Sequence, residues 1–400
     1  MDIRPIFNAM LRNRTGAVLI ALQIALTLAI VCNAMFIISA RVERMSRPLG
    51  YDVGNTFIVT MRAYAPDYNP AIAERLNLDL LRRLPGVRDA ASINEVPVSG
   101  GGWSDSLRTT PDPAQHGVEV GLYHVDSHGL SALGLQVSEG RAFTPDDIVR
   151  VANDHYTAPP VGILSRAAAD KLFPDQSALG KVVYDAGKPI TIIGIVDRME
   201  ASWPHWEGFE RTMLLPTVLE GPYMQYVVRT RPGERDRVMA AAEERLGSVH
   251  TGNFVRRIRS LEAYRDHIYG DDRAMAVVLL VVIALILAIT ALGIVALASF
   301  SVSQRTRQIG TRRALGARRR DIVSYFMTEN SLITLFGVVL GSALAVGLNY
   351  WLVDLYSLPP IAWYYLPLGI LCLWGLGLLA VLGPALRAAA ISPAIATRNV

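Results

Sequence analysis

"AMAVVLLVVIALILAITALGIVALASF", residues 274–300, is the stretch that decides the fold class of this 400-residue chain. It contains no charged residue. As a helix with a rise of 1.5 Å per residue it would measure about 40 Å, which is more than the ~30 Å hydrocarbon core of a bilayer. We therefore predict a membrane-spanning helix that tilts or projects beyond the bilayer.

Three further apolar runs have a similar length, at residues 16–40, 332–353 and 366–386. A buried core helix is the alternative for any one of them, but four such runs in one chain favour a membrane protein. Three arginines precede the first run, as they would in a secretion signal. The run exceeds the ~7–15 apolar residues of a cleaved signal, so we predict an uncleaved signal anchor, with a cleaved signal peptide as the alternative.

The short connections between the runs predict the orientation of the chain. The connection between the second and third runs contains "RTRQIGTRRALGARRRD", residues 305–321, with seven arginines and one acid. The connection between the third and fourth runs, residues 354–365, has Asp354 and no basic residue. Because basic residues of short loops stay on the cytoplasmic side, the arginine loop and both termini should be cytoplasmic. Residues 41–273 should then lie outside.

Basic charge is concentrated in the membrane part of the chain. Residues 41–273 contain 27 Lys and Arg against 31 Asp and Glu, whereas the rest contains 12 against 4. A nucleic-acid-binding domain would carry a basic surface of its own, so nucleic acid is excluded as the expected partner. Two interpretations of the arginine loop remain: it sets topology and contacts anionic lipid, or it binds another protein.

The segment 41–273 has the pattern of an α+β domain. Stretches of strand composition predict strands at residues 55–64, 87–98, 189–199 and 224–232. Helical spacing predicts helices at residues 70–86, 233–247 and 261–277, the last interrupted at Gly270 and serving as a stalk. In the first of these helices Leu76, Leu80, Leu81 and Leu84 should form the buried face.

The predicted organisation is an integral membrane protein with four transmembrane α-helices, one plus three, and a large α+β periplasmic domain inserted between spans one and two. Its segments are a cytoplasmic N-terminus at 1–15, span one at 16–40, the periplasmic domain with its stalk helices at 41–273, span two at 274–300, a cytoplasmic loop at 301–331, span three at 332–353, a short periplasmic loop at 354–365, span four at 366–386 and a cytoplasmic tail at 387–400.

No stretch of the sequence matches a catalytic or nucleotide-binding motif. The nearest approach to a phosphate-binding loop, "DQSALGKVV" at residues 175–183, has Asp175 in place of the first glycine and Val182 where Mg²⁺ needs a hydroxyl. His124 and His128 suggest a metal site if they lie one helical turn apart, but their flanks favour a strand-to-helix junction with solvated histidines. We therefore expect no enzyme activity and no catalytic, cofactor-binding or metal site in this chain.

The predicted spans contain no Asp, Glu, Lys, Arg or His. This absence argues against an ion or proton path through them. Gly337 and Gly341 form a GxxxG in span three, where small residues let helices approach closely. Transmembrane packing is the expected role of this pair, and a dimer face is one form that it could take.

Several motifs carry a resemblance that covers nearly the whole chain. "SQRTRQIGTRRALGARRRDIVSYFMTENSLITLFGVVLG", residues 303–341, resembles the signature of the MacB/FtsX-type ABC transporter permeases. "GLQVSEGRAFTPDD" at 134–147 and the segment from "VGILSRAAADKLF" at 161–173 to "ITIIGIVDRM" at 190–199 resemble the periplasmic core domain of that family. "PALRAAAISPAIATR" at 384–398 is similar to its C-terminal motif.

The resemblance implies a permease of the bacterial inner membrane that works as a homo- or heterodimer. A separate cytoplasmic ATPase would bind ATP and Mg²⁺ and power it, since this chain begins only some fifteen residues before span one. In the family a short coupling helix between spans two and three docks on the ATPase. The residues expected to form the docking site are Arg305, Arg307, Ile309, Gly310, Arg312, Arg313, Ala314, Leu315 and Gly316.

Efflux of an antibiotic, a peptide or another amphiphile from the periplasm is the function that the resemblance favours, with an adaptor protein and an outer-membrane channel as further partners. The alternatives are an FtsX-like regulator of a periplasmic cell-wall hydrolase, a permease for lipoprotein release, and a receptor without an ATPase. The sequence departs from the family at Gln304 and Gln308, where glutamates are usual, and at Thr311 in place of isoleucine. These changes make the loop more basic and put any ion pair of those glutamates in doubt.

Overall fold

The computed structural model describes residues 14–152, 157–249, 251–356 and 362–391. The chain divides into two compact units. Residues 47–270 form the α+β domain, and the segments on either side of them form the helical unit. The predicted fold class is confirmed: the described residues form four long apolar helices, and the α+β domain is inserted between the first and the second of them.

Several predictions concern residues outside the described ranges. Most of the predicted N-terminus at 1–15 and of the predicted tail at 387–400 lies there, with Arg4, Arg12 and Arg398. The centre of the predicted loop at 354–365 and the second half of the C-terminal motif also lie outside the described residues.

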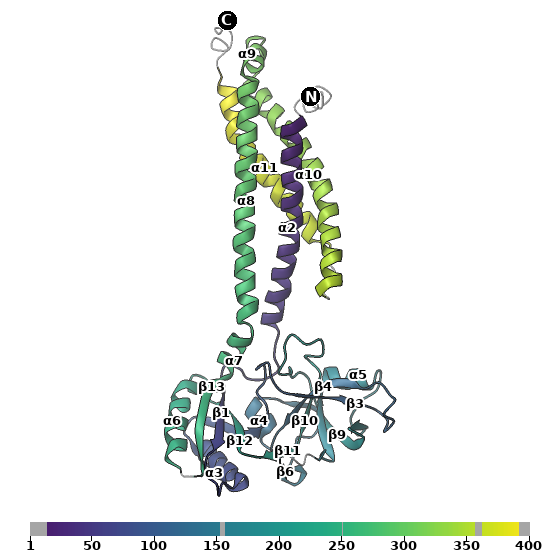
Figure 1. Cartoon of the computed structure of the whole chain (residues 1–400), viewed down its shortest axis with the longest axis vertical. Helices are drawn as coiled ribbons and strands as arrows, with labels where there is room; N and C mark the ends of the chain where they lie inside the picture. Colours follow the sequence, from purple (N-terminus) through teal and green to yellow (C-terminus); the bar gives the residue numbers. More distant parts are fainter. Residues whose placement is uncertain (1–13, 153–156, 250, 357–361, 392–400) are drawn as a thin grey trace. The chain divides into compact units, whose positions relative to one another are not determined.

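The helical unit consists of long helices joined by short connections (Figure 1). Its helices are α2 (Arg14–Ser46), α8 (Gly270–Gln304), α9 (Thr306–Ala314), α10 (Arg319–Tyr356) and α11 (Tyr365–Ala390). All except α9 are long and apolar enough to cross a membrane, and they contain the four apolar runs of the sequence. The chain is therefore a multi-pass membrane protein.

All four long helices extend further than the apolar runs predict, and α10 does so most. Helix α10 begins at Arg319, so it contains polar residues such as Glu329 that precede the run at 332–353. Helix α11 continues through Pro384, although proline lacks the N–H group that a helix interior uses. Pro384 is buried, and Ala385 beside it belongs to the core of the bundle, so packing supports the helix across the lost hydrogen bond.

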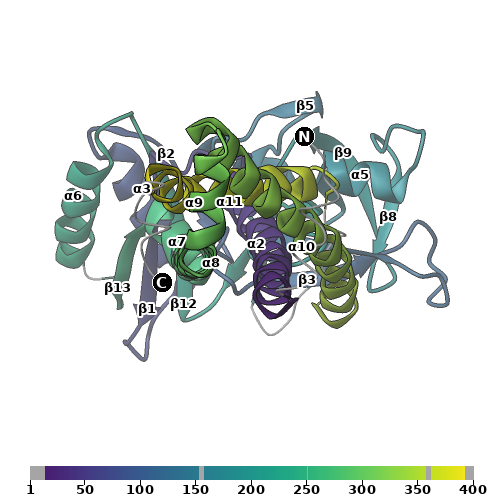
Figure 2. The ribbon, with the colours of Figure 1, turned by 90° about the horizontal axis from the view of Figure 1, so that it is seen from above.

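Helix α2 lies beside α10, and two glycines bring their backbones together (Figures 1 and 2). A Cβ atom on Gly341 would lie 2.9 Å from the Cα of Ala25, and one on Gly337 would lie 2.8 Å from the carbonyl oxygen of Ala21. The GxxxG pair thus mediates close contact within the chain. Helix α2 occupies this face of α10, so it is not a dimer face.

Polar side chains of α2 also connect it to its neighbours. The hydroxyl oxygens of Thr27 and Thr290 of α8 lie 2.8 Å apart, and Gln23 Nε2 donates to a backbone carbonyl of α8 at 3.2 Å. Asn33 Nδ2 donates to the carbonyl oxygen of Ala345 of α10 at 3.0 Å. In an apolar environment such bonds hold helices in a defined register.

An ion pair joins one end of α2 to one end of α8. Asp272 lies in the first turn of α8, where a carboxylate also stabilises the free N–H groups of the helix. It is buried and pairs with Arg41 and, at 3.5 Å, with Arg44 near the end of α2. The two helices that flank the inserted domain are therefore joined beside the insertion.

The α+β domain is built on two sheets and a separate strand pair within its described residues. Antiparallel neighbours form the smaller sheet in the order β13 (Asn253–Ser260), β1 (Thr56–Ala63), β12 (Tyr223–Thr230) and β2 (Val87–Ile93). The larger mixed sheet has the order β3 (Trp103–Leu107), β4 (Val118–His124), β10 (Thr212–Leu215), β7 (Val161–Ser165), β9 (Lys188–Val196) and β5 (Val137–Gly140), with β8 (Val182–Asp185) beside β9. The separate parallel pair is β6 (Val149–Ala152) with β11 (Thr217–Glu220).

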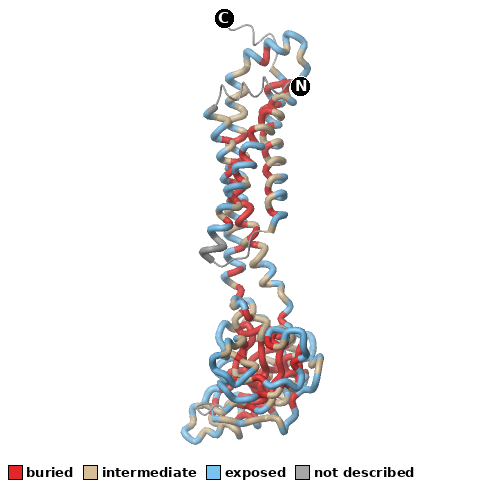
Figure 3. Tube along the Cα trace, turned by 90° about the vertical axis from the view of Figure 1, so that its right-hand side faces the viewer, coloured by how far each residue is buried: buried red, intermediate tan, exposed pale blue. Residues whose placement is uncertain are grey.

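Short helices pack against these sheets, and the buried residues of the domain lie in its interior (Figure 3). The short helices are α3 (Pro70–Arg83), α4 (Gly129–Leu133), a 3₁₀ turn (Pro145–Asp147), α5 (Arg166–Leu172), α6 (Arg235–Ser248) and α7 (Leu261–Ile268). Strand β1 alternates as a strand buried on both faces must: Phe57 and Val59 pack in the core with α3 and α6, whereas Ile58 packs in the core with α4 and the larger sheet.

The strands predicted at 55–64, 87–98, 189–199 and 224–232 are confirmed as β1, β2, β9 and β12, and the helices predicted at 70–86 and 233–247 are confirmed as α3 and α6. The helix predicted at 261–277 is interrupted at Tyr269, which separates α7 from α8.

The predicted buried face of α3 is partly wrong. Leu81 and Leu84 are buried, but Leu76 is exposed, and Glu74 and Asn77 are buried instead. Periodicity of leucines could not reveal this rotation of the helix, because polar residues are normally assigned to the exposed face.

Polar partners on neighbouring strands explain why α3 buries Glu74 and Asn77. Arg150 of β6 donates to Glu74 and also reaches Glu220 of β11 at 3.3 Å. Asn77 Nδ2 donates to the hydroxyl of Tyr226 of β12 at 3.3 Å. Burial is the largest influence on Glu74 and raises its pKa, while Arg150 acts in the opposite direction.

Candidate functional site: the arginine loop

The arginine loop, residues 305–321, folds into helix α9 and a tight turn. Arg305 alone separates α8 from α9, and residues 315–318 connect α9 to α10. The carboxylate of Asp321 accepts the backbone N–H of Arg318 at 2.8 Å, which satisfies one of the free N–H groups where α10 begins. Both connections of α9 are therefore short.

The turn after α9 is a Schellman motif centred on Gly316. The N–H of Gly316 donates to the carbonyl oxygen of Arg313, and the N–H of Ala317 donates to that of Arg312, both at 3.1 Å. Gly316 has a φ angle of 98°, which suits glycine and opposes a side chain. The end of α9 therefore has a defined geometry.

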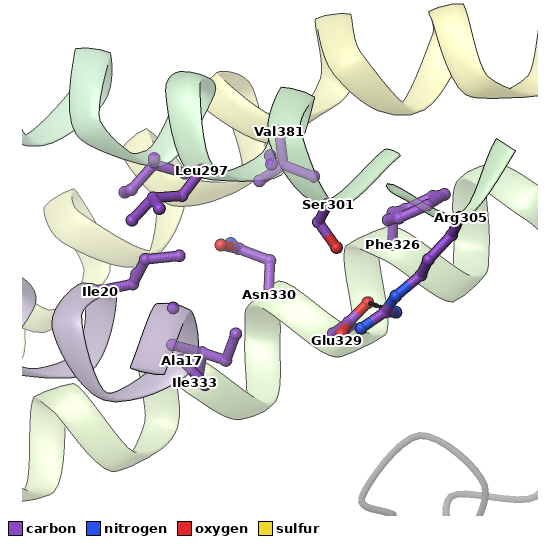
Figure 4. Close-up of a pocket in the computed structure, with 13 residues that line it drawn as sticks. Ala17, Ile20, Leu297, Ser301, Arg305, Phe326, Glu329, Asn330, Ile333 and Val381 are labelled. Carbon is purple, nitrogen blue, oxygen red and sulfur yellow. Dashed lines mark hydrogen bonds and ion pairs between the residues drawn. The ribbon is translucent and has the colours of Figure 1, made fainter. Parts of the chain in front are cut away.

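Arg305 anchors the start of α9 to α10. Its guanidinium donates to Glu329 Oε2 at 3.0 Å (Figure 4). It also donates to the hydroxyl of Tyr325 at 3.2 Å. Glu329 is 9% exposed and would be costly to bury without a partner. Glu329 was not among the predicted site residues, because it precedes the apolar run at 332–353 by three residues. That run contains no charged residue, but α10 begins before it, at Arg319.

Arg313 anchors the other end of α9 to α11. Its Nη1 atom donates to the carbonyl oxygens of Ala389 at 2.9 Å and Ile391 at 2.8 Å. The last carbonyl groups of a helix lack partners within the helix, and a cation there is favourable. Arg313 thus satisfies the end of α11 while it holds α9.

Ile309 and Gly310 form the inner face of α9. Both are buried, and Ile309 joins a core cluster with Ile322 and Phe326 of α10. Ile309 was expected to help form the docking site, but its side chain points into the bundle.

The outer face of α9 and its turn carry the other predicted docking residues: Arg307, Arg312, Ala314, Leu315 and Gly316 are all exposed. Leu315 is 84% exposed, the highest fraction among the exposed large apolar side chains of the described residues. Arg312 also packs over the ring of Tyr325, with its guanidinium carbon 5.1 Å from the ring centre. Gln304 and Gln308 are exposed as well.

The nine predicted docking residues therefore divide into two sets. The anchoring set, Arg305, Ile309, Gly310 and Arg313, binds α9 to its own bundle. The displayed set is Arg307, Arg312, Ala314, Leu315 and Gly316. Sequence could not separate the sets, because the partners of Arg305 and Arg313 are 24 and 76 residues away along the chain.

A small cavity lies behind Arg305, where α2, α8, α10 and α11 meet (Figure 4). Its volume is about 60 Å³, the space of about two water molecules. Ser301, Glu329 and Asn330 give it a polar side, and Ile20 and Val381 give it an apolar side. Asn330 Nδ2 has no hydrogen-bond partner among the described residues. The bundle is thus incompletely packed next to the arginine loop.

The histidine pair that suggested a metal site is divided by the fold. His124 ends β4 and is buried with its ring against Trp103, whereas His128 precedes α4 and binds Asp89 at 2.9 Å. The predicted strand-to-helix junction is confirmed. Within the described ranges, no group of three or more His, Cys, Asp or Glu side chains is placed to hold a metal ion.

Fold and site together define a multi-pass membrane protein with an inserted α+β domain and a rigidly held basic helix between its second and third long helices. Models of two protein families match the chain. The MacB-like periplasmic core domain matches residues 17–245, and the FtsX-like permease C-terminal region matches residues 280–393, which include the arginine loop. The chain therefore belongs to the MacB/FtsX family and is an ABC transporter permease of that type, as the sequence motifs predicted.

Curated relatives are similar at low identity. The macrolide export ATP-binding/permease protein MacB of Chromobacterium violaceum is 26% identical over 77% of this chain and 49% of its own length. The uncharacterized ABC transporter permease YknZ of Bacillus subtilis is 25% identical over 79% of this chain and 78% of its own length. The chain thus spans about half the length of the MacB relatives that it matches.

Solved structures also resemble parts of the chain. The extracellular domain of the noncanonic ABC-type transporter YknZ from Gram-positive bacteria is 21% identical and has a TM-score of 0.33, over 50% of this chain and all of that domain. The periplasmic region of MacB from Actinobacillus actinomycetemcomitans is 17% identical and has a TM-score of 0.36, over 56% of this chain and 97% of that region.

Proposed function

We propose that this chain is the permease subunit of an ABC transporter, and that the displayed set of α9 docks on a separate cytoplasmic ATPase that binds ATP and Mg²⁺. The observation that carries the proposal is Leu315, an almost fully exposed apolar side chain among arginines. It lies at the end of α9, a helix that Arg305 and Arg313 bind to the bundle. Exposed leucines on α8, α10 and α11 can face lipid, but one surrounded by arginines in a short loop cannot be explained in that way. A protein partner with a small apolar groove explains it.

The chemistry of the displayed set fits a groove with an acidic rim. Leu315 and Ala314 would enter the groove, while Arg307 and Arg312 would pair with carboxylates at its edge through their planar guanidinium groups. In the usual pattern of the family, acidic side chains replace Gln304 and Gln308. The neutral residues here therefore favour a partner rim that is more acidic than usual.

The anchoring set would pass a movement of α9 to the long helices. Arg305 connects α9 to α10, and Arg313 connects it to α11. The cavity behind Arg305 leaves space for a small relative shift of α8 and α10. Closure of the ATPase would thus reach the spans through hydrogen-bonded contacts, and the spans would act on the α+β domain.

The same proposal assigns orientation and partners. The arginine loop and both termini would be cytoplasmic, and residues 41–273 would be periplasmic. The chain would lie in the bacterial inner membrane, beside a second permease chain that is identical or related. Efflux of an antibiotic, peptide or other amphiphile from the periplasm, with an adaptor protein and an outer-membrane channel, is favoured over FtsX-like regulation of a hydrolase or lipoprotein release. The support is the match of the inserted domain to the MacB-like core and the name of the MacB relatives.

Affinity purification of the full chain from native membranes tests the proposal. The wild-type chain should recover an ABC ATPase. Leu315→Asp and Arg307→Glu should each reduce recovery of the ATPase at least tenfold, and the fold should tolerate both changes because both side chains are exposed. Arg313→Glu is a poor test, because it also breaks the contact with α11.

Leu76→Asp is the matched control, because Leu76 is an exposed leucine on a helix of the α+β domain. It should leave recovery of the ATPase unchanged. Recovery of no ATPase by the wild-type chain, or equal recovery by Leu315→Asp, would contradict the docking proposal.

A further inference from the structure

A second and larger cavity lies inside the α+β domain, where three groups of strands meet. It has a volume of about 260 Å³. Its walls come from the end of β2 and the start of β12 in the smaller sheet, from β3 and β4 in the larger sheet, and from β11. An isolated bridge between Ile93 and Val125 joins the two sheets beside it. The cavity therefore belongs to the junction of the sheets and is independent of the arginine loop.

Three polar groups on the cavity wall have no hydrogen-bond partner among the described residues: Asn94 Nδ2, Thr217 Oγ1 and Gln225 Oε1. Thr217 is 1% exposed. A buried donor or acceptor without a partner costs roughly 1–3 kcal/mol, so these groups need a partner that the cavity contains. Together they provide a donor, a hydroxyl that can donate or accept, and an acceptor.

The position of Asn94 is set by the backbone of β4, which leaves its amide nitrogen for the cavity. Asn94 Oδ1 accepts the N–H of His124 at 2.8 Å, and the N–H of Asn94 donates to the carbonyl oxygen of His124 at 3.2 Å. The side chain therefore cannot turn away without breaking the link between β2 and β4. The donor is preorganised, which lowers the entropic cost of binding.

Aromatic rings line the cavity and its mouth. Trp103 is 41% exposed and Tyr223 is 46% exposed, so both rings lie partly at the surface. Leu219 and Met224 add apolar contacts. Among the residues that the structure describes, no carboxylate, ammonium or guanidinium group lines the cavity. Burial lowers the pKa of His124 to about 4, so the imidazole is neutral at physiological pH. The walls favour an uncharged molecule.

We propose that this cavity binds one neutral ring of monosaccharide size that carries hydroxyl or acetamido groups. Hydroxyl groups and an acetamido group both donate and accept, as Asn94, Thr217 and Gln225 require, and the C–H face of a sugar ring packs on an aromatic side chain. The volume lies just below the ~300–1,000 Å³ of pockets for drug-sized ligands, which limits the occupant to about one ring. The inference goes beyond the proposed function and does not depend on an ATPase.

Ligand-observed saturation-transfer NMR on the full chain tests the proposal, in a detergent whose headgroup is not a sugar. The probe is N-acetylglucosamine, and glucosamine is its charged counterpart. N-acetylglucosamine should give saturation of its ring and methyl protons with a measurable Kd. Glucosamine should bind at least tenfold more weakly, because none of the described residues that line the cavity offers a carboxylate to pair with its ammonium group.

Variants of the wall decide whether the signal comes from this cavity. Thr217→Val keeps the shape of the side chain and removes the hydroxyl, and it should weaken binding about fivefold, the loss of one hydrogen bond. Thr56→Val is the matched control, because Thr56 is buried in β1 with a hydroxyl that also has no partner among the described residues, and it does not line the cavity. It should leave binding unchanged.

Leu219→Trp fills the cavity and should abolish the signal of N-acetylglucosamine. The proposal is overturned if N-acetylglucosamine gives no saturation, in which case the polar groups bind water alone. It is also overturned if Leu219→Trp or Thr217→Val binds as the wild-type chain does, or if glucosamine binds equally well. A thermal unfolding curve for each variant ensures that a lost signal is not a lost fold.

Discussion

The carboxyl group of Glu95 is enclosed by backbone and hydroxyl groups in the α+β domain. It accepts the backbone N–H of Trp103 and the hydroxyl of Ser202, the latter at 3.0 Å. A Cβ atom on Gly102 would lie 2.3 Å from Glu95 Oε2, so only glycine lets the backbone approach so closely. Burial raises the pKa of Glu95 to about 8, although both hydrogen bonds act in the opposite direction.

This burial should make the stability of the α+β domain depend on pH. Because the folded pKa lies above the ordinary value of ~4.3, the folded domain keeps a proton that the unfolded chain loses. The contribution of Glu95 to the free energy of unfolding should be largest below about pH 4 and fall by up to ~1.4 kcal/mol per pH unit until about pH 8. Glu95→Gln should reduce this slope in denaturant unfolding of the detergent-solubilised chain between pH 5 and pH 8.

The choice of variants makes this prediction specific to Glu95. Glutamine offers Trp103 the same acceptor, so the variant should fold. Glu200, whose pKa burial raises to about 7, should preserve part of the slope. Glu119→Gln, at an exposed position of β4, should leave the pH dependence as it is. An unchanged slope in Glu95→Gln would show that Glu95 is ionised in the folded domain.

The ion pair between Arg305 and Glu329 should show strong coupling. Arg305→Met and Glu329→Met should each destabilise the bundle, because each leaves one charge without its partner, whereas the double variant leaves neither. A double-mutant cycle measured by unfolding in detergent should give a coupling energy of ~1–3 kcal/mol. The more exposed pair of Arg235 and Glu262 serves as the comparison and should give less than ~1 kcal/mol. Additive single variants would mean that the pair does not form.

At the scale of elements, helix α9 depends on the turn that ends it. Gly316→Ala places a Cβ atom on a residue with a φ angle of 98° and should destabilise the turn by ~1–2 kcal/mol. Hydrogen exchange should accelerate at the amides of Gly316 and Ala317, whose hydrogen bonds define the motif. Gly316→Asn should cost less, because asparagine tolerates this conformation better. Equal exchange in all three proteins would show that the turn is not fixed.

The four long helices and some of the strands could be predicted from the sequence, because each has a local signal. A bilayer requires ~20 apolar residues, which hydropathy detects, and a buried strand such as β9 is a continuous apolar stretch. The rotation of α3 could not be predicted, because the burial of Glu74 depends on Arg150, 76 residues further along the chain. The extent of α10 could not be predicted either, since hydropathy ends where polar residues begin, whereas the helix continues to Arg319.

The sequence predicted which stretch forms the candidate site, but not which of its side chains lie at the surface. Charge and glycine spacing marked residues 305–321, and every predicted docking residue lies in or beside α9. Which arginines point inward depends on Glu329 and on the last carbonyl groups of α11, and no pattern within the loop identifies these partners. The cavity at the junction of the sheets had no signal in the sequence, because its wall combines segments between residues 92 and 225.

For the whole molecule, the distribution of arginines predicts which side of the membrane each unit faces. In a Cys372→Ala background, with Cys32 buried, Ser104→Cys on β3 and Ser303→Cys before the arginine loop provide exposed thiols. A membrane-impermeant maleimide should label Ser104→Cys in spheroplasts and Ser303→Cys only after permeabilisation. Labelling of both variants in detergent is the control for accessibility. The reverse pattern in spheroplasts would invert the proposed orientation.

The side chains that bind α9 to its own bundle are not the side chains that α9 exposes. This separation has a consequence for how related permeases diverge. Arg305 and Arg313 hold the loop to α10 and α11, whereas the side chains of Arg307 and Leu315 are exposed. Under the docking proposal, gene duplicates could exchange one ATPase for another by changing a few displayed positions, with no loss of folding. Replacing those positions alone in one permease with the residues of its paralogue should then make it bind the ATPase of the paralogue.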